Sequence, residues 1–139
     1  MSRNYYLFGS MKGDGFFKPL KEFWQLGALD ETSERWRLLS PVANLDKIKA
    51  PILMQMPEQE YVVALDYAIP LIREHRADLY VFPNEPHQKF QPRHKLAAYE
   101  RNIDWFRFWL QGYEDPDPAK RKEYKHWRVM KAAGVERSP

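Results

Sequence analysis

The sequence lacks several features that would place it in particular classes of protein. It contains no cysteine, which excludes disulfide frameworks and thiolate metal sites. No apolar run approaches the roughly 20 residues of a membrane-spanning helix, and the amino terminus has no signal-like apolar segment, so no membrane partner is expected. The formal net charge is only +3. Because nucleic-acid partners usually meet a concentrated basic face, no nucleic-acid partner is indicated.

The residues that are present favour a packed globular fold. The chain has 139 residues, of which 44% are hydrophobic and 15% aromatic, including five tryptophans. This length accommodates one domain with a sizeable core and is too short for two ordinary ones. Nothing in the sequence indicates a cofactor or a metal site.

Hydrophobic periodicity predicts alternating strands and helices. Strands are expected at residues 5–8, 51–56 and 79–82, and helices at 16–26, 31–39, 61–75, 93–111 and 119–133. The apolar run 51–56 lies between prolines and fits a strand buried on both faces of a parallel sheet. We expect Pro70 to kink or break its helix. Because the last helix has few apolar residues, we expect it to lie on the surface.

One histidine stands out by its place in the chain. His87 follows the strand at 79–82 and lies between Pro83 and Pro86, which end the strand and stiffen the loop. Open α/β sheets place their active sites at the carboxyl ends of buried strands. A loop histidine without a task remains the alternative from the local sequence alone.

Two glutamates follow the preceding strand. Glu58 and Glu60 belong to an acidic turn directly after residues 51–56. Because parallel strands end at the same edge of a sheet, either carboxylate is expected within reach of His87. A carboxylate that orients a basic imidazole is the second half of a nucleophilic triad. Solvated glutamates on an exposed loop are the alternative for either residue.

A nucleophile for such a triad is missing from the sequence. The serines are at positions 2, 10, 33, 40 and 138, and none of them lies in the G-x-S-x-G elbow of a hydrolase serine.

Three segments of the sequence together resemble a known family. They are L-S-P-V-A-N-L-D-K-I-K-A-P-I-L-M-Q-M (39–56), Y-V-F-P-N-E-P-H (80–87) and Q-P-R-H-K-L-A-A-Y-E-R-N-I-D-W-F-R-F-W-L (91–110). This combination is similar to the carboxyl-terminal part of a prolyl oligopeptidase-family catalytic domain, and within that family it resembles the lasso peptide isopeptidases. The resemblance implies an α/β fold, with a partial α/β-hydrolase domain at residues 1–118 and a helix and tail at 119–139.

The same resemblance implies a function and roles for three residues. The family members are serine peptidases, and the lasso peptide isopeptidases hydrolyse the isopeptide bond of a threaded peptide. His87 occupies the F-P-x-E-x-H position of the triad histidine. Relatives in the wider family usually carry H-G-x-x-D after the preceding strand, whereas this chain reads Q-M-P-E-Q-E from Gln55. Alignment of the two patterns puts the expected acid at Gln59, between Glu58 and Glu60. The lasso isopeptidases have a Glu followed by Tyr or a similar residue there, so the resemblance favours Glu60 as the triad acid, with Glu58 as a close second.

The family's serine would precede residue 1. We therefore expect a fragment that is inactive alone, whose partners are a peptide substrate and either the missing amino-terminal part of the same protein or a separate serine-bearing chain. The alternative is a non-catalytic peptide- or protein-binding module that uses the aromatic surface and the basic residues at 120–131.

Overall fold

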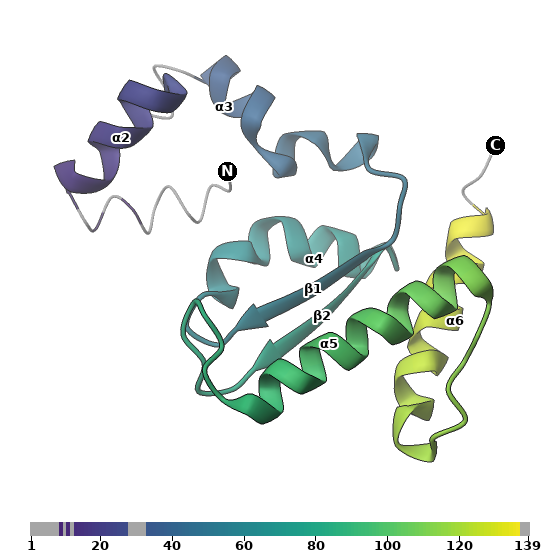
Figure 1. Ribbon diagram of the computed structural model, residues 1–139. Coiled ribbons are helices and arrows are strands. Elements are labelled where there is room, and N and C mark those ends of the chain that lie inside the picture. The colour runs from purple at the N-terminus through teal and green to yellow at the C-terminus, as the bar shows by residue number, and fades with distance from the viewer. Residues whose placement is uncertain (1–8, 10, 12, 28–32, 137–139) are drawn as a thin grey trace. The chain divides into compact units, whose positions relative to one another are not determined.

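The chain forms two compact units in the computed structural model (Figure 1), which describes residues 9, 11, 13–27 and 33–136. One unit comprises residues 1–49 and 62–70, and the other comprises residues 50–61 and 71–139. The predicted strand at residues 5–8 lies outside the described residues. None of the described helices is both long enough and apolar enough to cross a bilayer.

The first unit contains the two short helices that the sequence predicted. They are α2 (Asp14–Trp24) and α3 (Ser33–Leu39), and a 3₁₀ segment at Pro41–Lys47 follows them. Leu20, Leu26 and Trp36 form a small buried cluster. Helix α2 ends two residues before the predicted end at residue 26, because Gln25 adopts the left-handed conformation that ends the helix, with φ of 56°.

The second unit is built on a parallel pair of strands, as predicted. The strands are β1 (Ile52–Pro57) and β2 (Ala77–Phe82), paired from Ile52 opposite Ala77 to Pro57 opposite Phe82. Between them in the chain come a 3₁₀ turn at Tyr61–Ala64 and helix α4 (Leu65–Arg73), of which residues 62–70 belong to the first unit. Pro70 lies inside α4 and does not break it, which corrects that part of the expectation. The helix predicted at 61–75 is divided instead between residues 64 and 65, where the 3₁₀ turn meets α4.

Two further helices complete the second unit. Helix α5 (Pro92–Phe106) begins at a proline, whose missing N–H costs nothing at a first helical position, and continues as a π-helical turn at Arg107–Gln111. Gly112 ends it in the left-handed conformation, with φ of 68°. A 3₁₀ turn at Pro118–Lys120 then leads into α6 (Arg121–Glu136).

Helix α6 exposes most of its residues, as expected for a surface helix, but one of its faces is buried, which the sequence did not predict. Tyr124, Trp127 and Met130 of α6 are buried, and they share a core cluster with Trp105 and Phe108 of α5 and its π-helical turn. The Trp127 ring centroid lies 5.2 Å from those of Trp105 and Tyr124. Aromatic rings bury a large area each, so a few residues spaced three apart are enough to fix a helix.

Side-chain hydrogen bonds attach α5 and α6, whose ribbons Figure 1 shows, to one face of the strand pair. The Gln55 amide of β1 donates to the Ala98 carbonyl and the Asn102 side chain of α5. The Trp127 indole of α6 donates to the Asp78 carboxylate of β2 at 2.7 Å. Side chains alternate along a strand, and the register pairs Leu53 with Asp78, so these residues project from one face.

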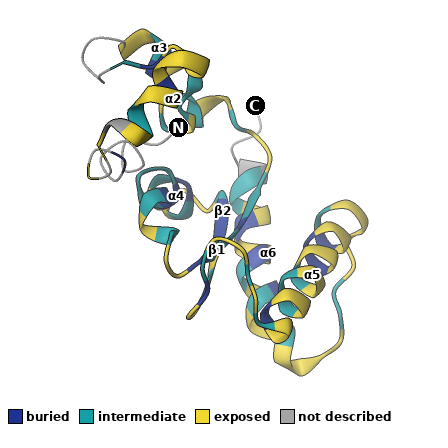
Figure 2. Cartoon of the chain, turned by 60° about the vertical axis from the view of Figure 1, so that its left-hand side comes forward, coloured by how far each residue is buried: buried dark blue, intermediate teal, exposed yellow. Residues whose placement is uncertain are grey.

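The outer face of α5 is apolar and exposed. Phe106 has 59% of its surface exposed. It belongs to a stripe with helical spacing, and the exposed surface along α5 is visible in Figure 2. The stripe consists of Leu96, Tyr99, Ile103, Phe106 and Leu110.

Candidate functional site

The candidate site lies in the two turns that follow the strands of the second unit. The backbone N–H of Glu58 donates to the Phe82 carbonyl at 3.0 Å and extends the strand pairing by one bond. The Glu58 carboxylate accepts from the N–H of Asn84 at 2.7 Å. The Gln59 N–H donates to the Glu85 carbonyl at 3.4 Å. The two turns are therefore cross-linked along one edge of the sheet.

Asn84 explains how the chain turns after β2. Its φ is 54°, in the left-handed region that asparagine tolerates better than most residues. The Glu58 carboxylate accepts from the N–H of this residue. Glu58 therefore supports the turn that leads into the histidine loop.

Glu60 and His87 meet at this edge. His87 Nδ1 lies 3.0 and 2.9 Å from the two carboxylate oxygens of Glu60. A carboxylate only accepts hydrogen bonds, so this arrangement places the imidazole proton on Nδ1 and leaves Nε2 as the basic nitrogen. Nε2 has no partner within the part of the chain that the structure describes. The contact fixes one ring nitrogen against a carboxylate and leaves the other nitrogen open.

The pair is open to solvent in this chain. The His87 side chain is 80% exposed and that of Glu60 is 37% exposed. An exposed ion pair contributes only about 0–1 kcal/mol to stability. The contact therefore orients the imidazole rather than holding the fold together.

Glu85 is a residue of this site to which the sequence argument gave no role. Its side chain is fully buried and accepts hydrogen bonds from the N–H groups of Phe90 at 2.8 Å and Gln91 at 3.2 Å. His94 Nδ1 lies 2.8 Å from its Oε1. Two sequence features could have indicated a role for this pair. Glu85 stands between two prolines, and His94 has the helical spacing that places it on the same face of α5 as Arg101 and Trp105.

The charge on Glu85 is supported by these contacts. Burial by itself acts to raise the pKa of the Glu85 carboxyl, but the N–H of Phe90, the imidazole of His94 and the N–H of Gln91 outweigh it. The pKa of Glu85 therefore lies below the ordinary value. The group is a carboxylate at neutral pH.

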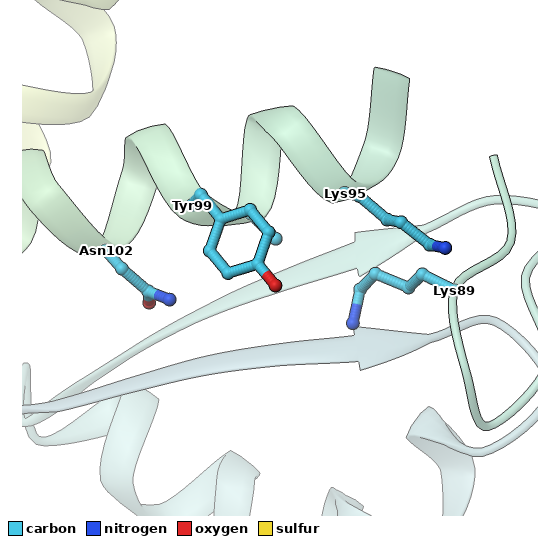
Figure 3. A pocket seen from close by; sticks show the side chains of 5 residues that line it. Lys89, Lys95, Tyr99 and Asn102 are labelled. Atoms are coloured by element: carbon cyan, nitrogen blue, oxygen red, sulfur yellow. The ribbon is translucent and has the colours of Figure 1, made fainter. Parts of the chain in front are cut away.

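A hollow of about 340 Å³ lies beside α5 (Figure 3). Lys95, Tyr99 and Asn102 extend into it from α5, and Lys89 extends from the loop that carries His87. The Lys89 ammonium donates to the Gln55 carbonyl at 3.3 Å. Among the described residues, no group of three acidic or imidazole side chains is arranged to hold a metal ion.

Comparisons with known proteins agree with these features. The chain is 42% identical over 98 residues to lasso peptide isopeptidase AtxE2 from Asticcacaulis excentricus. The match covers 70% of this chain and 14% of that protein. The chain thus spans about one seventh of the relative's length. No protein-family model matches the sequence.

Two solved structures of AtxE2 isopeptidase also match. A serine-to-alanine variant with Astexin3-dC4 bound gives a TM-score of 0.67 at 41% identity, over 71% of this chain and 15% of that one. The form without ligand gives 0.68 at 39% identity, over 74% and 16%. These matches confirm the predicted α/β-hydrolase-type fold. Over the shared region the chain is homologous to lasso peptide isopeptidase AtxE2, a likeness consistent with the prolyl oligopeptidase family that its motifs indicated.

Proposed function

We propose that this chain supplies the acid and base of a serine-type isopeptidase that opens a lasso peptide by hydrolysing its isopeptide bond. The observation that carries the proposal is the Glu60 carboxylate against His87 Nδ1 at the carboxyl edge of two parallel strands. The homology to an isopeptidase that has been captured with Astexin3-dC4 supports a peptide substrate.

In the proposed reaction, His87 moves the protons. A serine hydroxyl attacks the isopeptide carbonyl while Nε2 of His87 accepts its proton. The imidazolium then returns the proton to the leaving amine, so the C–N bond breaks and an acyl-enzyme forms. Water repeats the sequence on the ester and releases the carboxylic acid. Glu60 holds the ring orientation and stabilises the imidazolium throughout.

The proposal assigns different tasks to the two candidate acids. Glu60 contacts the imidazole, whereas Glu58 accepts from the backbone of Asn84. We therefore favour Glu60 as the orienting acid. The nucleophilic serine is proposed to come from a segment beyond these 139 residues, because the sequence contains no G-x-S-x-G elbow and the matched relative is about five times as long.

The two acids provide a matched experiment. Glu60→Gln and Glu58→Gln would be made in a protein that carries this chain with its serine-bearing segment, and opening of the peptide ring would be followed by the gain of one water in mass. We expect Glu60→Gln to lower kcat on the order of 1,000-fold, as loss of an orienting acid does in other triads. Glu58→Gln should stay within about tenfold. The reverse order of effects would refute the assignment.

The exposed apolar stripe on α5 favours a second function, a binding module without catalysis. This alternative predicts that the 139-residue chain binds a peptide or protein equally well with and without His87→Ala. Absence of peptide-ring opening by any protein that carries the chain would support it over the proposed hydrolase.

A further inference from the structure

Glu85 closes the base of the loop that carries His87. The loop leaves β2 after Phe82 and enters α5 at Pro92. Glu85, near the start of the loop, binds the N–H groups of Phe90 and Gln91 at its end. His87 thus lies in a short span of chain whose two ends are joined by one buried side chain.

The closure is also attached to the helix and the strand. His94, on the first turn of α5, contacts the Glu85 carboxylate, and its ring centroid lies 5.4 Å from that of Phe82 at the end of β2. A buried carboxylate is costly unless its oxygens are well paired, and three donors pair this one. Removal of Glu85 would leave all three donors without this acceptor.

The same residue reaches the turn that holds the acid. The main-chain carbonyl of Glu85 accepts from the N–H of Gln59, the residue before Glu60. Glu85 is thus bonded both to the loop of the imidazole and to the turn of its carboxylate. By contrast, the contact between Glu60 and His87 is exposed and too weak to order two turns by itself.

From this geometry we infer that Glu85 is a positioning residue: together with His94 it holds the loop so that His87 Nδ1 stays on the Glu60 carboxylate. The inference rests on the proposed function for its catalytic consequence. The positioning of the pair can be measured without any catalysis.

The test uses ¹⁵N NMR of the histidine ring nitrogens in the 139-residue chain, at about pH 8.5, two units above the ordinary histidine pKa. The variants are Glu85→Ala and the isosteric Glu85→Gln. Glu100→Ala is the control, because Glu100 is an exposed acid on α5, the helix that carries His94. Reference shifts come from a short peptide of sequence N-E-P-H-Q-K, in which the ring is free.

We expect the wild type and Glu100→Ala to show His87 enriched in the tautomer protonated at Nδ1. Glu85→Ala should move the His87 shifts toward those of the free peptide, and Glu85→Gln should move them less, because an amide oxygen still accepts from part of the donor set. A general loss of stability would not change these shifts in the folded state. If Glu85→Ala does not fold by circular dichroism, Glu85→Gln decides the outcome.

His87 shifts in a folded Glu85 variant that equal the wild-type shifts would overturn the inference. Wild-type shifts that equal those of the free peptide would do the same, since no held pair would exist. In the active enzyme, Glu85→Gln should lower kcat by up to about 100-fold with KM unchanged, as a misplaced catalytic group does. Full activity of His87→Ala would refute the proposed function and leave the NMR result to decide the positioning role.

Discussion

Replacing Trp127 by phenylalanine tests the packing of α6 against α5, because the substitution removes one buried hydrogen bond and keeps an aromatic ring. The indole N–H of Trp127 donates to the Asp78 carboxylate at 2.7 Å, and the residue is fully buried. A hydrogen bond to a charged group contributes about 1.5–3 kcal/mol. Arg101 still pairs with Asp78 at 2.6 Å in the variant, which favours the lower end of that range. The smaller ring loses about 1 kcal/mol more through reduced apolar burial.

Trp109→Phe is the matched control for this change. Its indole nitrogen is buried and has no hydrogen-bond acceptor among the described residues. Removal of an unpaired buried donor is close to neutral, so we expect a cost of about 1 kcal/mol or less. Urea unfolding followed by far-UV circular dichroism should therefore show that Trp127→Phe lowers the free energy of unfolding by about 2–3 kcal/mol. This corresponds to a decrease of about 1–2 M in the urea midpoint. Equal costs for the two variants would refute the packing described for α6.

Three further predictions concern other parts of the second unit. The pKa of Glu85 lies below its ordinary value of 4.5 because the donors of Phe90, His94 and Gln91 outweigh the effect of burial. Its contribution to stability is thus fully present above about pH 4.5 and is lost as the pH falls through the lowered pKa. The free energy of unfolding of Glu85→Gln, measured by urea titration between about pH 3 and 6, should depend less on pH than that of the wild type; parallel curves would contradict this. Lys120→Met removes the cation 2.7 Å from buried Asp104 and should cost about 2–3 kcal/mol, less than a fully buried pair because Lys120 is partly exposed; a cost under about 0.5 kcal/mol in the same assay would count against the ion pair. Ile103→Ser on the exposed stripe should change stability by no more than about 0.5 kcal/mol, and a large loss would mean that the stripe is covered.

The elements around the site could be predicted from the sequence because their signals are local. The apolar run before Pro57 and the strand that ends at Phe82 follow hydrophobic patterns, and Gly112 marks a helix end. The rule that parallel strands end at one edge then brings the acidic turn and the His87 loop together. The proximity of the acidic turn to the His87 loop could therefore be predicted from the sequence.

Other features depend on packing that no local pattern encodes. The burial of Trp127 required knowing that α6 returns against α5, and the exposure of Phe106 required knowing which face of α5 is covered. The separate contacts of the two glutamates, Glu60 with His87 and Glu58 with the N–H of Asn84, depend on the Asn84 turn. The left-handed conformation of Asn84 is set by its surroundings and could not be read from residue type alone.

The most direct test of the central claim is the turnover of His87→Ala on a lasso peptide. The substitution would be made in a protein that carries this chain together with its serine-bearing segment, and hydrolysis of the isopeptide bond would be followed by mass. The account predicts a loss in kcat of at least about 1,000-fold, with the fold intact by circular dichroism. Activity within a few-fold of the wild type would contradict the role of His87 as the base, and with it the proposed function of this chain.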